Sequence, residues 1–412
     1  MSEPQSELIS PRSPAIHTLG RPHLRVLGTD ISLLECIRER AEADLGITIS
    51  FESNPFLETQ RRAATQPESY DVYDQCFHNL DIVWFWRAIA PIDLNRVPLW
   101  GEINDLTKTG RISPEATLGP GDAPVRKLFV QPDRSLGPQQ SQYISMLPVV
   151  HNMDGFAVTE QVLRETGAEE PSWAWLLDKR WCGHVALVDE PAIGIFDAAL
   201  AARAAGLWSA RDIGNLGIKE IDQLMAVLKE KKRQGHFSGF WHTAAESVQL
   251  MNSGPTKLQS IWSPALTTLA ADDSFVQEVA PKEGYRAWHG GMCLSRNLQG
   301  RTLDVAYEYL NWWLSGWPGA VMARQGYYVS APKRARAFLS PQEWDYWYEG
   351  KPAACDLPGT DGRVVVHTGQ VRCGGSYWRR AKNIAVWNTS MEEHNYLARS
   401  WSDLVASGLR RN

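Results

Sequence analysis

The sequence predicts an α/β protein of two lobes, each built on a mainly parallel β-sheet. From His23 onward, short apolar segments alternate with amphipathic segments of helical period, a pattern typical of parallel sheets with helices on both faces. The chain has 412 residues, which is enough for two lobes. We find no internal repeat and no long low-complexity linker, so we expect the lobes to exchange strands rather than to be joined by a flexible tether.

The first part of the chain predicts a strand, a helix and two further strands. Residues 24–28 are an apolar run that ends at a glycine. Residues 29–46 predict a helix, with Ser32 and Glu35 at capping-box spacing and Gly46 as the stop. Residues 47–52 alternate β-branched side chains and predict the second strand, and residues 70–76 predict a third strand that ends in polar residues.

The middle of the chain continues the alternation. Residues 144–159 are an extended apolar stretch interrupted by polar side chains. Further strands are expected at 183–189 and 256–264, and amphipathic helices at 220–235 and 301–316.

Composition narrows the class of protein. The net charge is -5 and there is no basic stripe, so nucleic acid is not an expected partner. No segment approaches the ~20 apolar residues that a membrane span needs, and no cysteine or histidine cluster has metal-ligand spacing. We expect neither a metal nor another cofactor. Of the six cysteines only Cys355 and Cys373 lie close in the sequence, and whether they form a disulfide stays open.

Residues 1–23 are polar and Pro-rich and predict a disordered tail. They contain no apolar signal core. The protein is therefore either cytoplasmic, or a secretion signal has been removed and replaced by Met1.

The 18 tryptophans indicate where a ligand could bind. Most should fill the core, but several lie next to Gly, Pro or Ser, near turns, where they could line a site. In open parallel sheets, ligands bind at the carboxyl ends of the strands. Five segments end predicted strands in this way: "GTDIS", "YDQCF", "VVHNMDG", "IWSPA" and "WHGGM". Their convergence predicts a single cleft.

The order of longer segments resembles a known family. "ESYDVYDQCFHNL", "IAPIDLNRVPLWGEI", "SMLPVVHNMDGFAV", "PSWAWLLDKRWCGHVALVDEP", "WSPAL", "PKEGYRAWHGGMCLS" and "ARQGYYVSAPKRA" occur as in the spermidine/putrescine-type solute-binding proteins of ABC importers. The resemblance covers roughly residues 24–340.

The resemblance implies a type II periplasmic-binding-protein fold, in which two crossing strands join the lobes and the ligand binds in the interlobe cleft. The crossing strands would lie near 144–158 and 282–292. It also implies a monomeric receptor in the periplasm that delivers its ligand to an ABC permease of the inner membrane. The implied domains are lobe 1 at 24–146 and 286–330, lobe 2 at 147–285, and a C-terminal extension at 331–412 that packs on the lobes.

Matched to the polyamine binders, the chain keeps the aromatic rings but not the acids. The rings fall on Trp262, Trp288 and Tyr328 or its neighbour Tyr327. Where the family has acids, this chain has Ala265, Gly290, and Ala192 or Ile193. Removing the hydration of two or more ammonium groups without paired carboxylates costs several kcal/mol per charge. The resemblance therefore implies the fold and the transport role but argues against a polyamine.

The candidate site combines these rings with polar groups, and Gly290 and Gly291 would open space for a bulkier ligand. One or two carboxylates beside aromatic rings suit a single cation, and a nearby Arg or His suits a carboxylate of the same molecule. We therefore expect a monocationic or zwitterionic nitrogenous solute. The predicted ligand-binding residues are Thr29, Asp30, Gln75, His151, Asp154, Trp262, Ser263, Trp288, His289 and Tyr328, with Asn152 and Arg286 as further candidates.

Several alternatives stay open. A sugar or opine receptor of the same fold would stack pyranose faces on the rings, and a polyamine binder is the family's usual form. A carbohydrate-active enzyme would need two carboxylates ~5–10 Å apart, and Asp30 and Asp154 are the only pair near one site. Because no GxSxG, phosphate-binding loop or HExxH motif occurs, we do not expect an enzyme.

Overall fold

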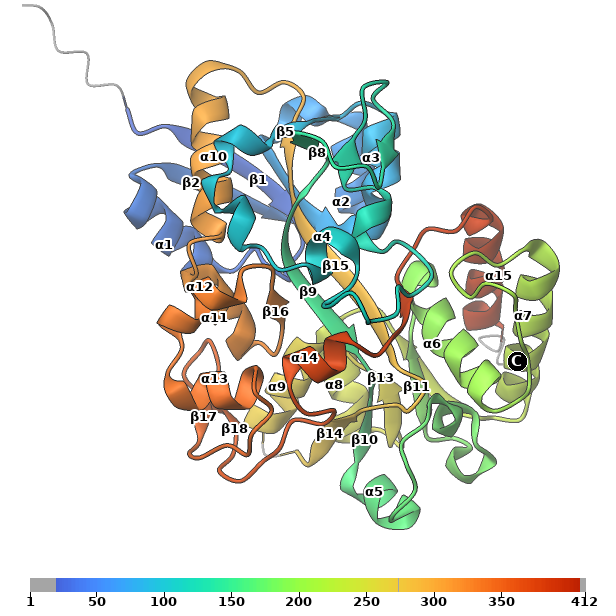
Figure 1. Cartoon of the computed structure of the whole chain (residues 1–412). Coiled ribbons are helices and arrows are strands. Elements are labelled where there is room, and N and C mark those ends of the chain that lie inside the picture. Colours follow the sequence, from blue (N-terminus) through green and yellow to red (C-terminus); the bar gives the residue numbers. More distant parts are fainter. Residues whose placement is uncertain (1–19, 273, 408–412) are drawn as a thin grey trace, which may run out of the picture.

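The computed structural model of the chain describes residues 20–272 and 274–407 (Figure 1). Within these ranges the strands form an eight-stranded sheet, a five-stranded sheet and two smaller sheets of four and two strands. Most of the expected N-terminal tail, residues 1–23, lies outside the described residues, and the first strand begins at His23. The protein is an α/β fold with two principal sheets, as the sequence predicts.

The eight-stranded sheet forms the core of the first lobe. Its strands follow the order β16-β9-β15-β3-β1-β2, with β4 and β19 also pairing with β15. β1 pairs in parallel with β2 and β3, whereas β15 runs antiparallel to β3, β4 and β9. The expectation of a mainly parallel sheet is therefore wrong for its middle, because β15 returns from the other lobe. The bounds are β1 His23–Gly28, β2 Thr48–Ser53, β3 Val72–Cys76, β4 Ile89–Ala90, β9 Leu147–Asp154, β15 Tyr285–Ser295, β16 Tyr328–Val329 and β19 Ile384–Trp387.

The helices α1, α2, α3, α4, α10 and α11 belong to this lobe. Helix α1 begins at Glu35 and not near Ser32 as predicted, because the Ser32 hydroxyl donates to Asp74 (2.6 Å) instead of capping the helix. Gly46 does end the helix, in the left-handed conformation. The bounds of these helices are α1 Glu35–Leu45, α2 Phe56–Thr65, α3 Leu80–Phe85, α4 Leu106–Thr109, α10 Gly300–Trp313 and α11 Trp317–Arg324. The four-stranded sheet consists of β5 Ile92–Asp93, β6 Phe129–Val130, β7 Leu136–Gly137 and β8 Tyr143–Ile144.

The five-stranded sheet forms the second lobe, in the order β12-β11-β13-β10-β14. β11 pairs in parallel with β12 and β13, and β10 is antiparallel to β13 and β14. Its apolar core includes Trp173, Trp181 and Trp401, which confirms that many tryptophans fill the interior. The bounds are β10 Phe156–Thr159, α5 Glu160–Thr166, β11 Val185–Val188, α6 Pro191–Ala204, α7 Ile218–Arg233, β12 Phe237–Trp241, α8 Ala244–Ser253, β13 Leu258–Ser260, α9 Ser263–Ala271 and β14 Val276–Val279.

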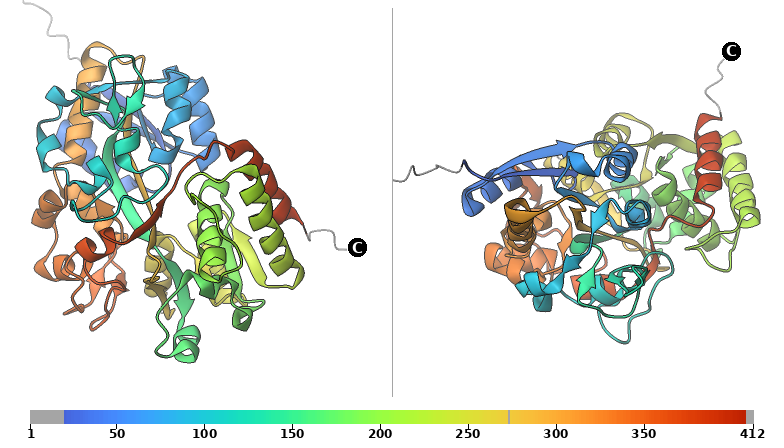
Figure 2. Two further views of the ribbon diagram at one scale, coloured as in Figure 1. Left: turned by 45° about the vertical axis from the view of Figure 1, so that its right-hand side comes forward. Right: turned by 90° about the horizontal axis from the view of Figure 1, so that it is seen from above.

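Two strand connections cross between the lobes, one from β9 to β10 and one from β14 to β15 (Figure 1). They lie close together at Gly155, where an added Cβ would stand 2.2 Å from the carbonyl oxygen of Val279. A third segment also crosses: β19 pairs with β15, and the chain then runs to α15, His394–Ala406, which packs on α6 and α7 (Figure 2). The sequence predicts the first two crossings but not the third.

Of the predicted C-terminal extension, 331–412, residues 331–383 pack against both lobes, and we keep the name for this part, because β19 and α15 join the sheet of the first lobe and the helices of the second. Its Trp344, Trp347 and Tyr377 belong to one apolar cluster with Met153 and Tyr285 of the crossing strands. The extension therefore covers one side of the crossing strands. Its elements are α12 Pro332–Ala335, α13 Pro341–Trp347, β17 Leu357–Pro358, β18 Val364–Val366 and α14 Tyr377–Ala381.

Candidate functional site

The crossing strands β9 and β15 present two different faces. Their antiparallel register pairs Asp154 with Arg286, Asn152 with Trp288, and His151 with His289. Because successive residues of a strand point to opposite sides, adjacent residues of the predicted site cannot share a face. We call the side with Asn152, Asp154, Arg286 and Trp288 the interlobe face, and the side with His151, Met153, Ala287 and His289 the covered face.

An ionic cluster occupies the interlobe face. The buried Arg286 guanidinium lies 2.7 Å from Asp197 of α6 and 3.2 Å from Asp154 of β9. It also donates to Asn388 of the third crossing (3.3 Å). Burial raises the pKa of Asp154 to about 7, although the guanidinium favours its ionised form. The cluster thus joins elements of both lobes through a single cation.

Aromatic rings adjoin this cluster. Trp288 donates its indole N–H to Asp154 (3.0 Å), and its ring meets Tyr327 edge-on at 5.4 Å. Burial raises the pKa of Tyr327 well above its usual value, and the charges of Asp154 and Asp30 add to this shift. Asp30, which is exposed, therefore lies near the same rings.

The second lobe contributes the start of α9. Trp262 is half-buried just before this helix, and its ring lies edge-on to Trp241 at 4.8 Å. The Ser263 hydroxyl accepts a hydrogen bond from Asn152 (2.9 Å), which also donates to Asp154 (2.7 Å). Asn152 thus connects α9 to the ionic cluster.

Glu190 is an acid near this face that the match to polyamine binders missed, and the charge of Arg286 acts on its pKa. It follows β11 and directly precedes α6, whereas the match placed the lost acid at Ala192 or Ile193. Burial raises its pKa to about 8, and its Oε2 has no hydrogen-bond partner among the described residues. Its neighbour Asp189 is already bonded to Trp401 (2.9 Å).

Glu190 also lies near the end of β3 in the first lobe. Burial, together with negative charges that include Glu190, raises the pKa of the Cys76 thiol at the end of β3. The signal that could have found it is an acid between a strand and a Pro-initiated helix, the position at which site loops gather.

His151, His289 and Tyr328 do not lie on the interlobe face. His151 Nε2 is 3.0 Å from the Tyr377 hydroxyl, and the His289 ring packs 4.1 Å from Phe77. Tyr328 is buried against Tyr377, with ring centroids 4.6 Å apart. Burial lowers the pKa of His151 to about 3 and that of His289 well below its usual value, so both stay neutral. We leave all three residues out of the candidate site.

Thr29 and Gln75 serve mainly the backbone. Thr29 is buried, and its carbonyl accepts from Leu33 (3.3 Å). The Gln75 side-chain carbonyl accepts from the N–H of Cys76 (2.8 Å). Both lie at strand ends, as predicted, and the buried Nε2 of Gln75 has no hydrogen-bond partner among the described residues.

The glycines after His289 serve sheet packing. A Cβ on Gly291 would lie 1.9 Å from the Leu147 carbonyl, and one on Gly290 would lie 3.1 Å from that of Gln75. The register between β15 and β9 also shifts at this pair. The expectation that they open space for a ligand is therefore wrong: they let the backbones of β3, β9 and β15 approach closely.

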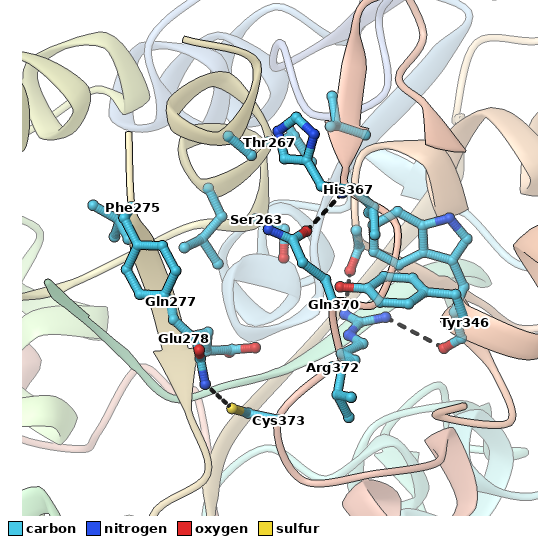
Figure 3. A pocket seen from close by; sticks show the side chains of 18 of the residues that line it. Ser263, Thr267, Phe275, Gln277, Glu278, Tyr346, His367, Gln370, Arg372 and Cys373 are labelled. Carbon is cyan, nitrogen blue, oxygen red and sulfur yellow. Dashed lines mark hydrogen bonds between the residues drawn. The ribbon is translucent and has the colours of Figure 1, made fainter. Parts of the chain in front are cut away.

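A cavity of about 680 Å³ lies between α9, β14 and the C-terminal extension (Figure 3). Of the predicted residues, only Ser263 lines it. All six cysteines fall within the described ranges and are free, including Cys355 and Cys373. In these ranges no group of three His, Cys, Asp or Glu side chains is placed to hold a metal, and no helix is long and apolar enough to cross a membrane.

Two α/β lobes joined by crossing strands define the fold of the two-lobed periplasmic solute-binding proteins, and solved structures of ABC transporter binding proteins share it. Three of them are the spermidine/putrescine substrate-binding protein PotD of Streptococcus pneumoniae, solved with calcium and HEPES, the Atu4243-GABA receptor, and MotA of A. tumefaciens B6 with glucopine.

The likeness covers nearly the whole of each chain at low identity. PotD has a TM-score of 0.59 at 13% identity, covering 93% of this chain and 97% of its own. The GABA receptor has 0.58 at 14%, covering 95% and 99%, and MotA has 0.56 at 12%, covering 93% and 99%. No protein-family model matches the sequence, and no curated protein matches it either.

Proposed function

We propose that the protein is the solute-binding receptor of an ABC importer and captures a small monocationic or zwitterionic nitrogenous solute between its lobes. The observation that carries this proposal is the interlobe face itself. Aromatic rings and an acid without an ion pair surround the strands that connect the lobes, where hinge closure would enclose a ligand. The shared fold of transport receptors supports the same function.

The charges on this face favour a single cation. Asp154 and Asp197 share the Arg286 guanidinium. Within the described part of the chain, Glu190 and Asp30 form no ion pair, and the pKa of Glu190 is raised to about 8. One ammonium group beside Glu190 would restore its ionised form and could stack on Trp262 or Trp288. A polyamine would need further paired carboxylates.

A carboxylate on the same solute would be met at the N-terminus of α9. The first turn of a helix offers free N–H groups and a positive dipole end, and α9 begins at Ser263, beside Asn152. A zwitterion could therefore span from Glu190 to Ser263.

The remaining features of a receptor belong to the proposal. We place the protein in the periplasm, after removal of a signal segment, as a monomer that docks on a permease of the inner membrane. The first lobe would comprise residues 24–146 and 286–330 and the second 147–285, with 331–412 packing on both. The crossing strand β9 lies at this boundary and pairs within the sheet of the first lobe. We assign no catalytic role. Asp154 is paired with the Arg286 guanidinium, so it does not act with Asp30 as the pair of carboxylates that a carbohydrate-active enzyme needs.

An opine or sugar receptor is the second candidate. Trp262 and Trp288 offer ring faces, and MotA, which shares the fold, was solved with glucopine. A solute of this kind would differ from the first candidate in its size and hydroxyl content.

A thermal-shift screen tests the proposal. The purified protein would be melted with putrescine, GABA, glycine betaine, glucopine and glucose in turn. A ligand at 100 times its dissociation constant adds ~2.7 kcal/mol of stability. We expect GABA, glycine betaine or glucopine to raise Tm and putrescine to leave it unchanged, and we expect Trp288→Ala to remove the shift. A shift with putrescine alone, or no shift with any compound, would contradict the proposal.

A further inference from the structure

The cavity between α9, β14 and the extension is built as a binding pocket. Its volume of about 680 Å³ is within the range of small-molecule sites. Figure 3 shows Phe275 and Gln277 of the second lobe on one side, facing Gln370 and Arg372 of the extension. Phe275 is half-exposed overall and contributes a large apolar ring to the lining of this cavity.

Two buried arginines of the extension differ in how their charge is balanced. Arg380 lies 3.0 Å from Glu278, whose other oxygen accepts from the N–H of Gly155 (2.9 Å). Arg372 is only 7% exposed and forms no ion pair with any carboxylate in the described ranges. Because Arg380 balances Glu278, the cavity wall keeps one uncompensated cation.

Arg372 is held in place without being neutralised. It donates to the carbonyls of Gly326 (2.6 Å) and Trp347 (3.4 Å), and its guanidinium lies 4.5 Å from the ring centroid of Tyr328. These contacts fix the guanidinium plane. An arginine so oriented binds a carboxylate through charge-assisted hydrogen bonds more readily than a mobile one, since little side-chain entropy is lost.

The rest of the wall suits an apolar body with few polar groups. The rings of Phe275, Tyr346 and Trp347 and several valines provide apolar contact, and Thr267 and Gln370 provide a hydroxyl and an amide. We propose that this cavity is a second ligand site, which takes a small monocarboxylate with an aromatic or branched apolar body, and that Arg372 binds the carboxylate.

Saturation-transfer NMR with benzoate and benzamide tests the charge requirement on the full-length protein. The two probes share the ring and differ in the negative charge. We expect benzoate to bind and benzamide to bind at least tenfold more weakly. Arg372→Gln should remove this preference.

Two neighbouring threonines of α9 provide a matched pair that locates the site. Thr267 lines the cavity and Thr268 does not, yet both are half-buried and both donate to the carbonyl of Pro264 (3.0 and 2.9 Å). Thr267→Trp should fill the cavity and abolish benzoate binding, whereas Thr268→Trp should keep it. Trp288→Ala should keep it as well, because Trp288 does not line the cavity, and Ser263 is the one described residue that borders both proposed sites.

Four results would overturn the inference: no binding of benzoate, equal binding of benzamide, binding that survives Thr267→Trp, or binding that is lost in Trp288→Ala. The last would place benzoate on the interlobe face. None of these results depends on which solute the interlobe face takes, so the two proposals can fail separately.

Discussion

The two faces of the crossing strands carry alternate residues of the same segments, yet they differ in every chemical respect. The interlobe face holds one cation, two carboxylates and an indole that hydrogen-bonds one of them. The covered face holds neutral histidines packed against rings of the first lobe and of the extension. Both faces are buried, and in our proposal only the interlobe face exchanges its contacts for a ligand.

This difference shows what the extension does for the fold. The rings of Tyr377 and Tyr348 pack at tilted and edge-on angles against His151 and Tyr328 and cover this face. With that side sealed, the interlobe face is the side of the strands that both lobes approach. The same strands therefore support stability on one side and, in our proposal, binding on the other.

The largest expected effect comes from breaking the ionic cluster with Arg286→Met. Removing the guanidinium leaves Asp154 and Asp197 buried without their counter-charge, and the loss of one partner of a buried ion pair costs about 3–5 kcal/mol. Urea unfolding at pH 8, where both acids should ionise most, measures it. The double variant Arg286→Met/Asp197→Asn should recover part of the loss. A cost below about 1 kcal/mol would mean that water reaches the cluster.

The adjacent glycines should respond very differently to alanine. Gly291→Ala sets a methyl group against the Leu147 carbonyl and should cost about 3 kcal/mol or more through strand displacement. Gly290→Ala meets the Gln75 carbonyl at 3.1 Å and should cost only about 1 kcal/mol. Thermal unfolding of the two variants compares them. Equal costs would show that β9 can shift at the register change.

Trp288 and His289 test the two faces directly. Trp288→Ala removes a ring on the interlobe face and should weaken solute binding by about 2 kcal/mol, as expected of a central aromatic contact. His289→Ala should lower Tm without changing the affinity, because His289 packs on Phe77 and Trp387. Calorimetric titration with the solute found in the thermal-shift screen measures both. A loss of affinity in His289→Ala alone would reverse the assignment of the faces.

Much of this fold could be predicted from residue patterns. The strand at 24–28, the stop at Gly46 and the helix at 220–235 all appear, because local periodicity and capping decide them. The start of α1 could not, since Ser32 bonds to Asp74, which is far away in the sequence. The antiparallel return of β15 is likewise a tertiary feature.

The candidate site was less predictable than the fold. The sequence pointed to the segments around Asp154 and Trp288, which the structure places on one face, but it counted their neighbours His151 and His289, on the opposite face, as equals. Strand alternation would have separated the pairs had the strands been placed in register. The face covered by the extension could not be inferred, because most of the extension, from about residue 345 onward, lies beyond the part of the chain that resembles a known family. For the same reason, neither Arg372 nor the cavity that it lines could be predicted.

Glu190→Gln has the smallest expected effect but the most specific one, because it should increase the stability of the protein and weaken the binding of the solute. The folded pKa of about 8 lies above the ordinary value of 4.5. The native state therefore holds a proton that the unfolded chain releases, and this contribution to stability is lost as the pH rises from 4.5 to 8. Glutamine has nearly the same shape as glutamate but does not titrate. The free energy of unfolding of the variant should therefore fall less between pH 4.5 and pH 8, and at pH 8 the variant should be about 1 kcal/mol more stable than the parent protein. If Glu190 pairs with the ammonium group of the solute, the same variant should bind it more weakly. Unfolding curves from pH 5 to pH 8 measure the stability, and a titration with the solute at pH 7 measures the affinity. A gain in stability with unchanged affinity would mean that Glu190 titrates as described but does not contact the solute.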